Sequence, residues 1–329
     1  MVTFGASRRR GLCRRVARWL LLGFFCFTSV GFLLRFFGFQ VGDFGRCESD
    51  PFGRRDPRAM RGSTSGSAPL FSVGISSVER PNTSYLMATL ESLISNLRGD
   101  DANKVTVVVL LSPSWDVNNR TYVMRTQSQI HRKYPELIKS GRLEVLTPSL
   151  TDYPNVWSTL HVDGNDSLTR VKWRTKQVLD YAFLMTHCLD KAPYYMQLED
   201  DVVTIAGWAS EVEAMIRRFN HSEWHMLEFA SLGFIGKLFA REELRQLIDF
   251  MTLFYTSKPV DWLLEDFFAV KYCSGRMTPR ECQQKKNTLI KRRRISLFQH
   301  VGRFSSLEGT LNKLKEKRFG PQPIGRTKM

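Results

Sequence analysis

The chain has 329 residues, of which 43% are hydrophobic and 24% are charged, and 48 lysines and arginines against 32 acids give a net charge of +16. This composition excludes disordered, collagen-like and multi-pass membrane proteins and predicts one packed domain of about 250 residues. The basic excess lies at the two ends, with six arginines in 1–18 and fifteen lysines and arginines against three glutamates in 276–329. Because the middle is nearly neutral, we expect no nucleic-acid partner.

Residues 19–41 form an apolar stretch interrupted by a single charge, Arg35. The stretch is long enough to cross about 30 Å of hydrocarbon, and the arginines before it favour the cytosolic side. A cleaved signal peptide and a buried core helix are the alternatives, but no convincing small-residue cleavage motif follows the stretch. We expect a cytosolic basic tail over 1–18, a signal-anchor transmembrane helix over 19–41, and a lumenal remainder, as in a single-pass type II membrane protein.

Two features agree with a lumenal, oxidising compartment. Cys273 and Cys282 are separated by eight residues in a polar segment that contains Gly and Pro, which suits a small disulfide loop. Neither cysteine has the CxxC or CxxH companion that a zinc site needs. Four N-glycosylation sequons follow the apolar stretch and none precedes it. Their asparagines are Asn82, Asn119, Asn165 and Asn220.

The rest of the chain predicts an α/β domain. Residues 42–69 are rich in Gly, Ser, Arg, Asp and Pro without apolar periodicity, and we expect a flexible stem there. The folded domain should cover 70–310, with a basic tail over 311–329. Apolar runs predict strands over 70–75, 105–111 and 194–198, and helical spacing of apolar residues predicts helices over 84–97, 168–189 and 206–219. This alternation favours a mostly parallel, Rossmann-like sheet with helices on both faces.

The strand at 194–198 runs into three consecutive acids, Glu199, Asp200 and Asp201. Ligands of such sheets bind beyond the carboxyl ends of the strands. Three adjacent carboxylates repel one another, so a cation is expected to offset them, and oxygen ligands suit Mg²⁺ or Mn²⁺. A solvated acidic turn is the alternative interpretation.

Six segments resemble the N-acetylglucosaminyltransferase IV family, and their order and spacing hold from about 73 to 309. They are RVKWRTKQ (170–177), YYMQLEDD (194–201), EWHMLEF (223–229), LGFIGK (232–237), DWLL (261–264) and SLFQHVG (296–302). The resemblance implies a GT-A glycosyltransferase of the Golgi membrane. Such an enzyme transfers N-acetylglucosamine from UDP-GlcNAc, in β1,4 linkage and with inversion, to the α1,3-linked mannose arm of N-glycans on glycoproteins, and it requires a divalent metal.

The resemblance also implies roles for individual residues. Asp201 matches the last acid of the metal motif and should face the divalent ion, with Mn²⁺ preferred to Mg²⁺. Glu199 and Asp200 would serve the ribose, the sugar or the hydrogen bonding of the site. Three basic residues are expected near the nucleotide, or else at the surface or as charges near helix ends: Arg80, Lys172 and Arg174.

An inverting transfer needs a carboxylate that removes the proton of the acceptor hydroxyl. Asp261, which precedes Trp262, is the preferred base, and the alternative is that it caps the helix that follows. The family pattern continues Leu-Leu-Asp-His where this chain has Leu-Leu-Glu265-Asp266, so these two acids are further candidates. His300 either approaches the metal or fills the core with its hydrogen bonds satisfied.

The chain also departs from the family pattern. A carbohydrate-binding domain usually follows the catalytic domain in that family, whereas this sequence ends in a basic tail. The departures leave a second hypothesis open, a weak or inactive Golgi relative that modulates other glycosyltransferases. The basic cluster 291–294 is expected to be a solvated surface, with UDP phosphate binding as the alternative.

Overall fold

The computed structural model describes residues 68–80, 83–113, 120–158, 160–162, 166–307 and 309–320. The expected cytosolic tail and transmembrane helix, and the stem as far as residue 67, lie outside the described residues. In the described part of the chain, no helix combines the length and the apolar character that a membrane crossing requires.

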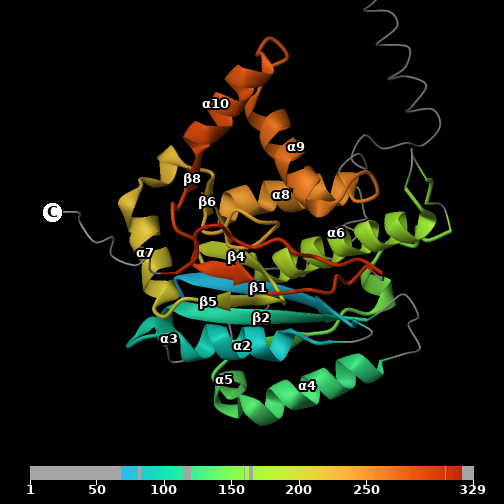
Figure 1. Cartoon of the computed structure of the whole chain (residues 1–329), viewed down its shortest axis with the longest axis vertical. Coiled ribbons are helices and arrows are strands. Elements are labelled where there is room, and N and C mark those ends of the chain that lie inside the picture. The colour runs from blue at the N-terminus through green and yellow to red at the C-terminus, as the bar shows by residue number, and fades with distance from the viewer. Residues whose placement is uncertain are drawn as a thin grey trace, which may run out of the picture. The chain divides into compact units, whose positions relative to one another are not determined.

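A seven-stranded mixed sheet forms the centre of the domain, with the strand order β3-β2-β1-β4-β7-β6-β8 (Figure 1). All neighbouring strands pair in parallel except β7, which is antiparallel to both β4 and β6. The strands are β1 (Phe71–Val78), β2 (Val105–Ser112), β3 (Leu143–Leu146), β4 (Tyr194–Glu199), β6 (Met226–Glu228), β7 (Lys237–Ala240) and β8 (Ile290–Arg292). The prediction of a mostly parallel sheet is therefore confirmed.

Helices cover both faces of the sheet, as predicted (Figure 1). One face packs on α2 (Leu86–Ser95), α4 (Thr121–Lys133) and α7 (Trp208–Arg218). The other packs on α6 (Leu168–Cys188), α8 (Arg241–Phe254) and α9 (Val260–Tyr272). The remaining helices are α3 (Asp101–Lys104), α5 (Pro135–Lys139) and α10 (Pro279–Leu289), with 3₁₀ turns η2 (Leu150–Asp152) and η3 (His221–Glu223).

The central strands are apolar on both sides because both sides are covered. Every residue of β2 is buried, which explains its continuous run of branched apolar side chains. On β1 the inward-facing residues alternate, so that Phe71, Val73 and Ile75 join the core on the α2 side. The opposite side of β1 carries small residues, and a Cβ at Gly74 would collide with the ring of Tyr195 from β4.

A second, two-stranded sheet joins distant parts of the chain. Strand β5 (Val202–Thr204) pairs antiparallel with β9 (Phe298–His300), and His300 lies opposite Val202 in the register. The chain stays on the domain after β9: Arg318 accepts a backbone hydrogen bond from Ser296, and the carboxylate of Glu316 accepts one from Ser231. Residues 311–320 are therefore packed against the domain, ten residues beyond the expected boundary at 310.

Candidate active site

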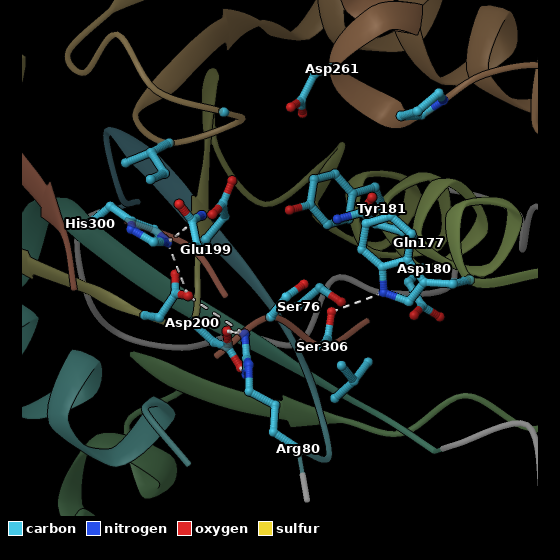
Figure 2. Close-up of a pocket in the computed structure, with 18 of the residues that line it drawn as sticks. Ser76, Arg80, Gln177, Asp180, Tyr181, Glu199, Asp200, Asp261, His300 and Ser306 are labelled. Atoms are coloured by element: carbon cyan, nitrogen blue, oxygen red, sulfur yellow. Dashed lines mark hydrogen bonds and ion pairs between the residues drawn. The ribbon is translucent and has the colours of Figure 1, made fainter. Parts of the chain in front are cut away.

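A cleft of about 400 Å³ opens at the carboxyl ends of β1, β2 and β4 (Figure 2). Four parts of the chain line it in addition to these strand ends: α6, the 232–235 loop, the start of α9 and the segment after β9. The acidic triplet lies at its base, as expected for chemistry placed at the end of a buried strand.

The three acids of the triplet have different partners. Arg80, just after β1, donates two hydrogen bonds to the carboxylate of Asp200, at 2.7 and 2.6 Å, and Ser77 donates a third. Asp200 is 3% exposed, so its charge is compensated by a buried arginine. Arg80 was expected near a nucleotide; it lines the cleft, but its guanidinium is already engaged by Asp200.

Glu199 and Asp201 are grouped with His300, and one ligand atom from each lies within 4.8 Å of the others. The pairing of β5 with β9 brings the histidine to this place, where its Nε2 lies 3.3 Å from an oxygen of Asp201. The other oxygen of Asp201, Oδ1, is buried and has no hydrogen-bond partner among the residues that the structure describes. Two carboxylates and an imidazole around an unsatisfied oxygen form a donor set that fits a divalent cation, and the imidazole favours Mn²⁺ over Mg²⁺.

The electrostatics of this cluster also favour an added positive charge. Burial, together with the charges of Asp201 and Asp261, raises the pKa of Glu199 to about 8. Burial opposes protonation of His300, but its hydrogen bond to Asp201 and the charge of that carboxylate prevail and raise the pKa of the imidazole. The cluster thus retains protons in the absence of a cation.

Two glycines leave room for the ligand carboxylates. A Cβ on Gly302 would collide with the carboxylate of Asp201, and a Cβ on Gly233 would lie 2.5 Å from an oxygen of Glu199. Gly233 also has a positive φ of 46°. The backbone N–H of Phe234, the next residue, donates to that same oxygen at 3.1 Å. Backbone therefore packs closely against both carboxylates and donates a hydrogen bond to that of Glu199.

Asp261 lines the cleft from the first turn of α9 (Figure 2). The alternative role as a helix cap is wrong, because the N-cap residue is Pro259 and the carboxylate of Asp261 caps no backbone group. Its side chain remains accessible to solvent in the cleft, yet the surrounding protein raises the pKa of the carboxyl by desolvation. An accessible carboxylate with a raised pKa suits a general base.

Four other predicted site residues lie away from the cleft. Glu265 forms an ion pair with Lys286 at 2.7 Å, and Asp266 forms one with Lys258 at 2.6 Å. Arg174 is buried beneath the surface and donates to the carbonyl of Ser257. The fourth, Lys172, is half-buried on α6 and does not line the cleft.

Sequence reasoning missed the wall that α6 supplies. Trp173, Gln177 and Tyr181 recur at intervals of four residues and all line the cleft. This helical spacing begins in the RVKWRTKQ segment and continues to Tyr181, and it was the sequence signal for the wall. Nearby, Lys176 forms an ion pair at 2.9 Å with Asp180, which also accepts a hydrogen bond from Tyr153.

The structure also describes the predicted disulfide, one of the sequon asparagines and the basic cluster. Cys273 and Cys282 form a disulfide bond between the end of α9 and the start of α10. Asn220 is exposed, whereas Asn82, Asn119 and Asn165 lie outside the described residues. The basic cluster 291–294 does not line the cleft. Arg292 forms an ion pair with Glu228, and Arg293 forms one with Glu211.

The comparisons with known proteins agree with these features. Human alpha-1,3-mannosyl-glycoprotein 4-beta-N-acetylglucosaminyltransferase B is 41% identical over 252 residues, which are 77% of this chain and 45% of that protein. The rat A enzyme is 38% identical over 247 residues, 75% of this chain and 46% of that protein. The chain thus spans about half the length of the curated relatives it matches.

Similar solved structures are more distant. Residues 1–349 of Staphylococcus aureus TarS in complex with UDP-GlcNAc align with a TM-score of 0.30 at 16% identity, covering 50% of this chain and 35% of that one. Mouse xyloside xylosyltransferase 1 aligns with a TM-score of 0.35 at 9% identity, covering 61% and 75%. The family model "MGAT4 conserved region" matches residues 48–319. The chain therefore belongs to the MGAT4 family, that of the N-acetylglucosaminyltransferase IV enzymes.

Proposed function

We propose that this chain is a metal-dependent GT-A glycosyltransferase. It would transfer N-acetylglucosamine from UDP-GlcNAc, in β1,4 linkage, to the α1,3-linked mannose arm of N-glycans on glycoproteins. The observation that carries the proposal is the cluster of Glu199, Asp201 and His300 at the base of a cleft that Asp261 also lines. The names of the relatives supply the sugar and the linkage.

Glu199, Asp201 and His300 would hold the divalent metal. When bound, a divalent cation neutralises negative charge that builds up on the leaving diphosphate. Asp201 has an oxygen free for it, Oδ1, and the hydrogen bond from Phe234 to Glu199 keeps that second carboxylate in place. Arg80 and Asp200 support the cluster from behind, because their ion pair holds the turn between β4 and β5.

Asp261 would remove the proton of the acceptor hydroxyl while that oxygen attacks the anomeric carbon of the donor sugar. The bond from the sugar to the diphosphate breaks in the same displacement, and UDP leaves with the electron pair. One displacement inverts the configuration, so an α-linked donor gives a β-linked product. A raised pKa makes Asp261 a better proton acceptor than an ordinary aspartate at a pH above that pKa.

We also propose that the domain works in the lumen of the Golgi, anchored as a single-pass type II membrane protein through 19–41. The disulfide between Cys273 and Cys282 supports this placement, since such bonds persist in oxidising compartments. The exposed sequon asparagine Asn220 is accessible for glycosylation there.

The purified full chain tests the function directly. With Mn²⁺ and labelled UDP-GlcNAc it should transfer sugar to a biantennary N-glycan, and Asp201→Ala should abolish transfer. Asp190→Ala removes a carboxylate that is 58% exposed outside the cleft and should leave the rate unchanged. Absence of turnover together with absence of UDP binding would refute the proposal, and absence of turnover alone would favour a non-catalytic modulator.

A further inference from the structure

The two ends of the cleft differ in their chemistry. One end carries charged groups, namely Arg80 and the cluster of Glu199, Asp201 and His300. The other end is the α6 wall, defined here as Trp173, Gln177 and Tyr181, whose side chains are an indole, an amide and a phenol. Lys176 and Asp180 also line the cleft there, but they neutralise each other in an ion pair at 2.9 Å. Figure 2 shows the Tyr181 hydroxyl directed into the cavity, toward the space between Glu199 and Asp261.

Two contacts fix the α6 wall, one behind it and one within the lining of the cleft. Tyr181 is 4% exposed, and its ring packs edge-on against Phe234 with 5.5 Å between centroids. Trp173 donates from Nε1 to the hydroxyl of Ser306 at 3.0 Å, which ties α6 to the segment after β9. A fixed ring with only its hydroxyl reaching the cavity can discriminate between ligands, because it cannot move to suit another one.

Two polar groups of this wall have no partner within the described chain. Neither the amide of Gln177 nor the hydroxyl of Tyr181 makes a hydrogen bond to a described residue, and both residues line the cavity. Burial and the nearby charges of Glu199 and Asp261 raise the pKa of Tyr181 well above its usual value. The phenol therefore stays protonated and remains a hydrogen-bond donor.

We propose that Gln177 and Tyr181 bind the transferred sugar of the nucleotide sugar and determine specificity for it. This inference rests on the proposed function. Neutral hydrogen-bonding groups beside an aromatic ring suit a neutral, polyhydroxylated ring, whereas a phosphate calls for cations. Lys176, on the same helix, is not free for a phosphate because Asp180 and Ser112 engage its ammonium group.

The position of the Tyr181 hydroxyl indicates that the α6 wall would bind the donor sugar and not the acceptor. The sugar that is transferred must lie between the diphosphate at the metal cluster and the base that activates the acceptor. Tyr181 faces the space between Glu199, of that cluster, and Asp261, the proposed base. Gln177 lies one helical turn away on the same wall, about 6 Å along α6, which is within the span of one sugar ring.

Calorimetry with the full chain and Mn²⁺ separates the sugar from the nucleotide. We expect Tyr181→Phe and Gln177→Leu each to weaken UDP-GlcNAc binding about fivefold to tenfold while leaving UDP binding unchanged, since each loses one hydrogen bond to the sugar. Tyr255→Phe, at the end of α8 and outside the cleft, is the matched control and should change neither. Thermal unfolding of each variant checks that the fold is kept.

The outcomes distinguish the two proposals. If the wild-type chain binds UDP-GlcNAc and both variants bind it equally well, the sugar subsite is refuted while the proposed function stands. If the variants lose UDP and UDP-GlcNAc affinity to the same extent, the two residues do not read the sugar, and the inference is again refuted. If the wild-type chain binds neither ligand, the proposed function fails and takes the inference with it.

Discussion

The ion pair between Arg80 and Asp200 predicts a strong energetic coupling between the ends of β1 and β4. The side chains are 8% and 4% exposed, and two charged hydrogen bonds of 2.6–2.7 Å join them. Replacing Arg80 by Met leaves the Asp200 carboxylate buried and unpaired. Breaking a buried pair in this way costs about 3–5 kcal/mol of unfolding free energy, or a Tm lower by about 6–20 °C in a domain of this size.

The reverse substitution should cost less. In Asp200→Asn the arginine keeps a second carboxylate in reach, because its Nη2 lies 3.7 Å from an oxygen of Asp201. The asparagine still accepts from Ser77 or Arg80, so we expect a loss of about 1–2 kcal/mol. In the double variant neither buried charge is left alone. Its loss should therefore be at least about 2 kcal/mol smaller than the sum of the single losses.

Urea unfolding of the four proteins, followed by tryptophan fluorescence, measures this cycle. If the two single losses add within about 0.5 kcal/mol, the pair is not coupled. That result would refute the inference that Asp200 stabilises the fold through its ion pair with Arg80. Asp201→Asn is the informative contrast. Because Oδ1 has no partner among the described residues and the asparagine amide oxygen can still accept from His300, we expect a smaller loss of stability than in Arg80→Met, together with a loss of Mn²⁺ affinity.

Three further predictions concern the cleft and the disulfide. Burial raises the pKa of Asp261, so this carboxylate becomes protonated and can no longer accept a proton as the pH falls through that pKa. The acid limb of a kcat/KM profile should therefore lie at a pH above the ordinary aspartate range, and Asp261→Asn should transfer too slowly for such a profile to be measured. Gly302→Ala pushes a methyl group onto Asp201 and should weaken Mn²⁺ binding at least about tenfold in a titration followed by calorimetry, whereas an unchanged affinity would argue against Asp201 as a ligand. The disulfide between Cys273 and Cys282 closes a loop with a sequence separation of 9, so its reduction should cost about 2.5 kcal/mol in urea unfolding, and equal midpoints with and without reductant would contradict this.

The sequence was most informative about the central strands. An uninterrupted apolar run such as 105–111 occurs where both faces of a strand are covered, and β2 extends one residue beyond it, to Ser112. The first strand was expected over 70–75 and instead covers Phe71–Val78, because Ser76 and Ser77 are polar residues that remain in the ladder. The helix expected over 84–97 is shorter, Leu86–Ser95.

The sequence located the candidate acids of the site but did not show which role each would have. Glu265 lies one helical turn after Asp261, about 6 Å further along α9, and this displacement takes it out of the cleft to Lys286 of α10. No local sequence pattern predicts the ion-pair partner of a charged side chain when that partner comes from another helix. The same holds for the triplet, in which Arg80, 120 residues away, donates its two hydrogen bonds to Asp200 and reaches Asp201 only at 3.7 Å.

His300 shows why the candidate metal cluster of Glu199, Asp201 and His300 was the hardest part to predict. The histidine reaches Asp201 only because β9 pairs with β5, two three-residue strands whose partners are almost a hundred residues apart in the chain. Strands this short carry too few residues to display an alternation of buried and exposed positions. The long-range pairing sets which nitrogen faces the acids: the carbonyl of Leu314 lies 3.2 Å from Nδ1, and Nε2 is directed to Asp201.

The segment after β9 runs between the two ends of the cleft and contacts both. Its basic composition did not predict this contact with the site. The carbonyl of Leu314 orients the imidazole of His300 at the metal cluster, while Ser306 accepts from Trp173 on the α6 wall. The hydroxyl of Tyr85, at the start of α2, accepts hydrogen bonds from the backbone N–H groups of residues 303 and 304. The segment touches both ends of the cleft, so a ligand held at either end lies beside it. If the proposed function holds, a nucleotide sugar that spans the cleft would lie against this segment both at the cluster of Glu199, Asp201 and His300 and at the α6 wall.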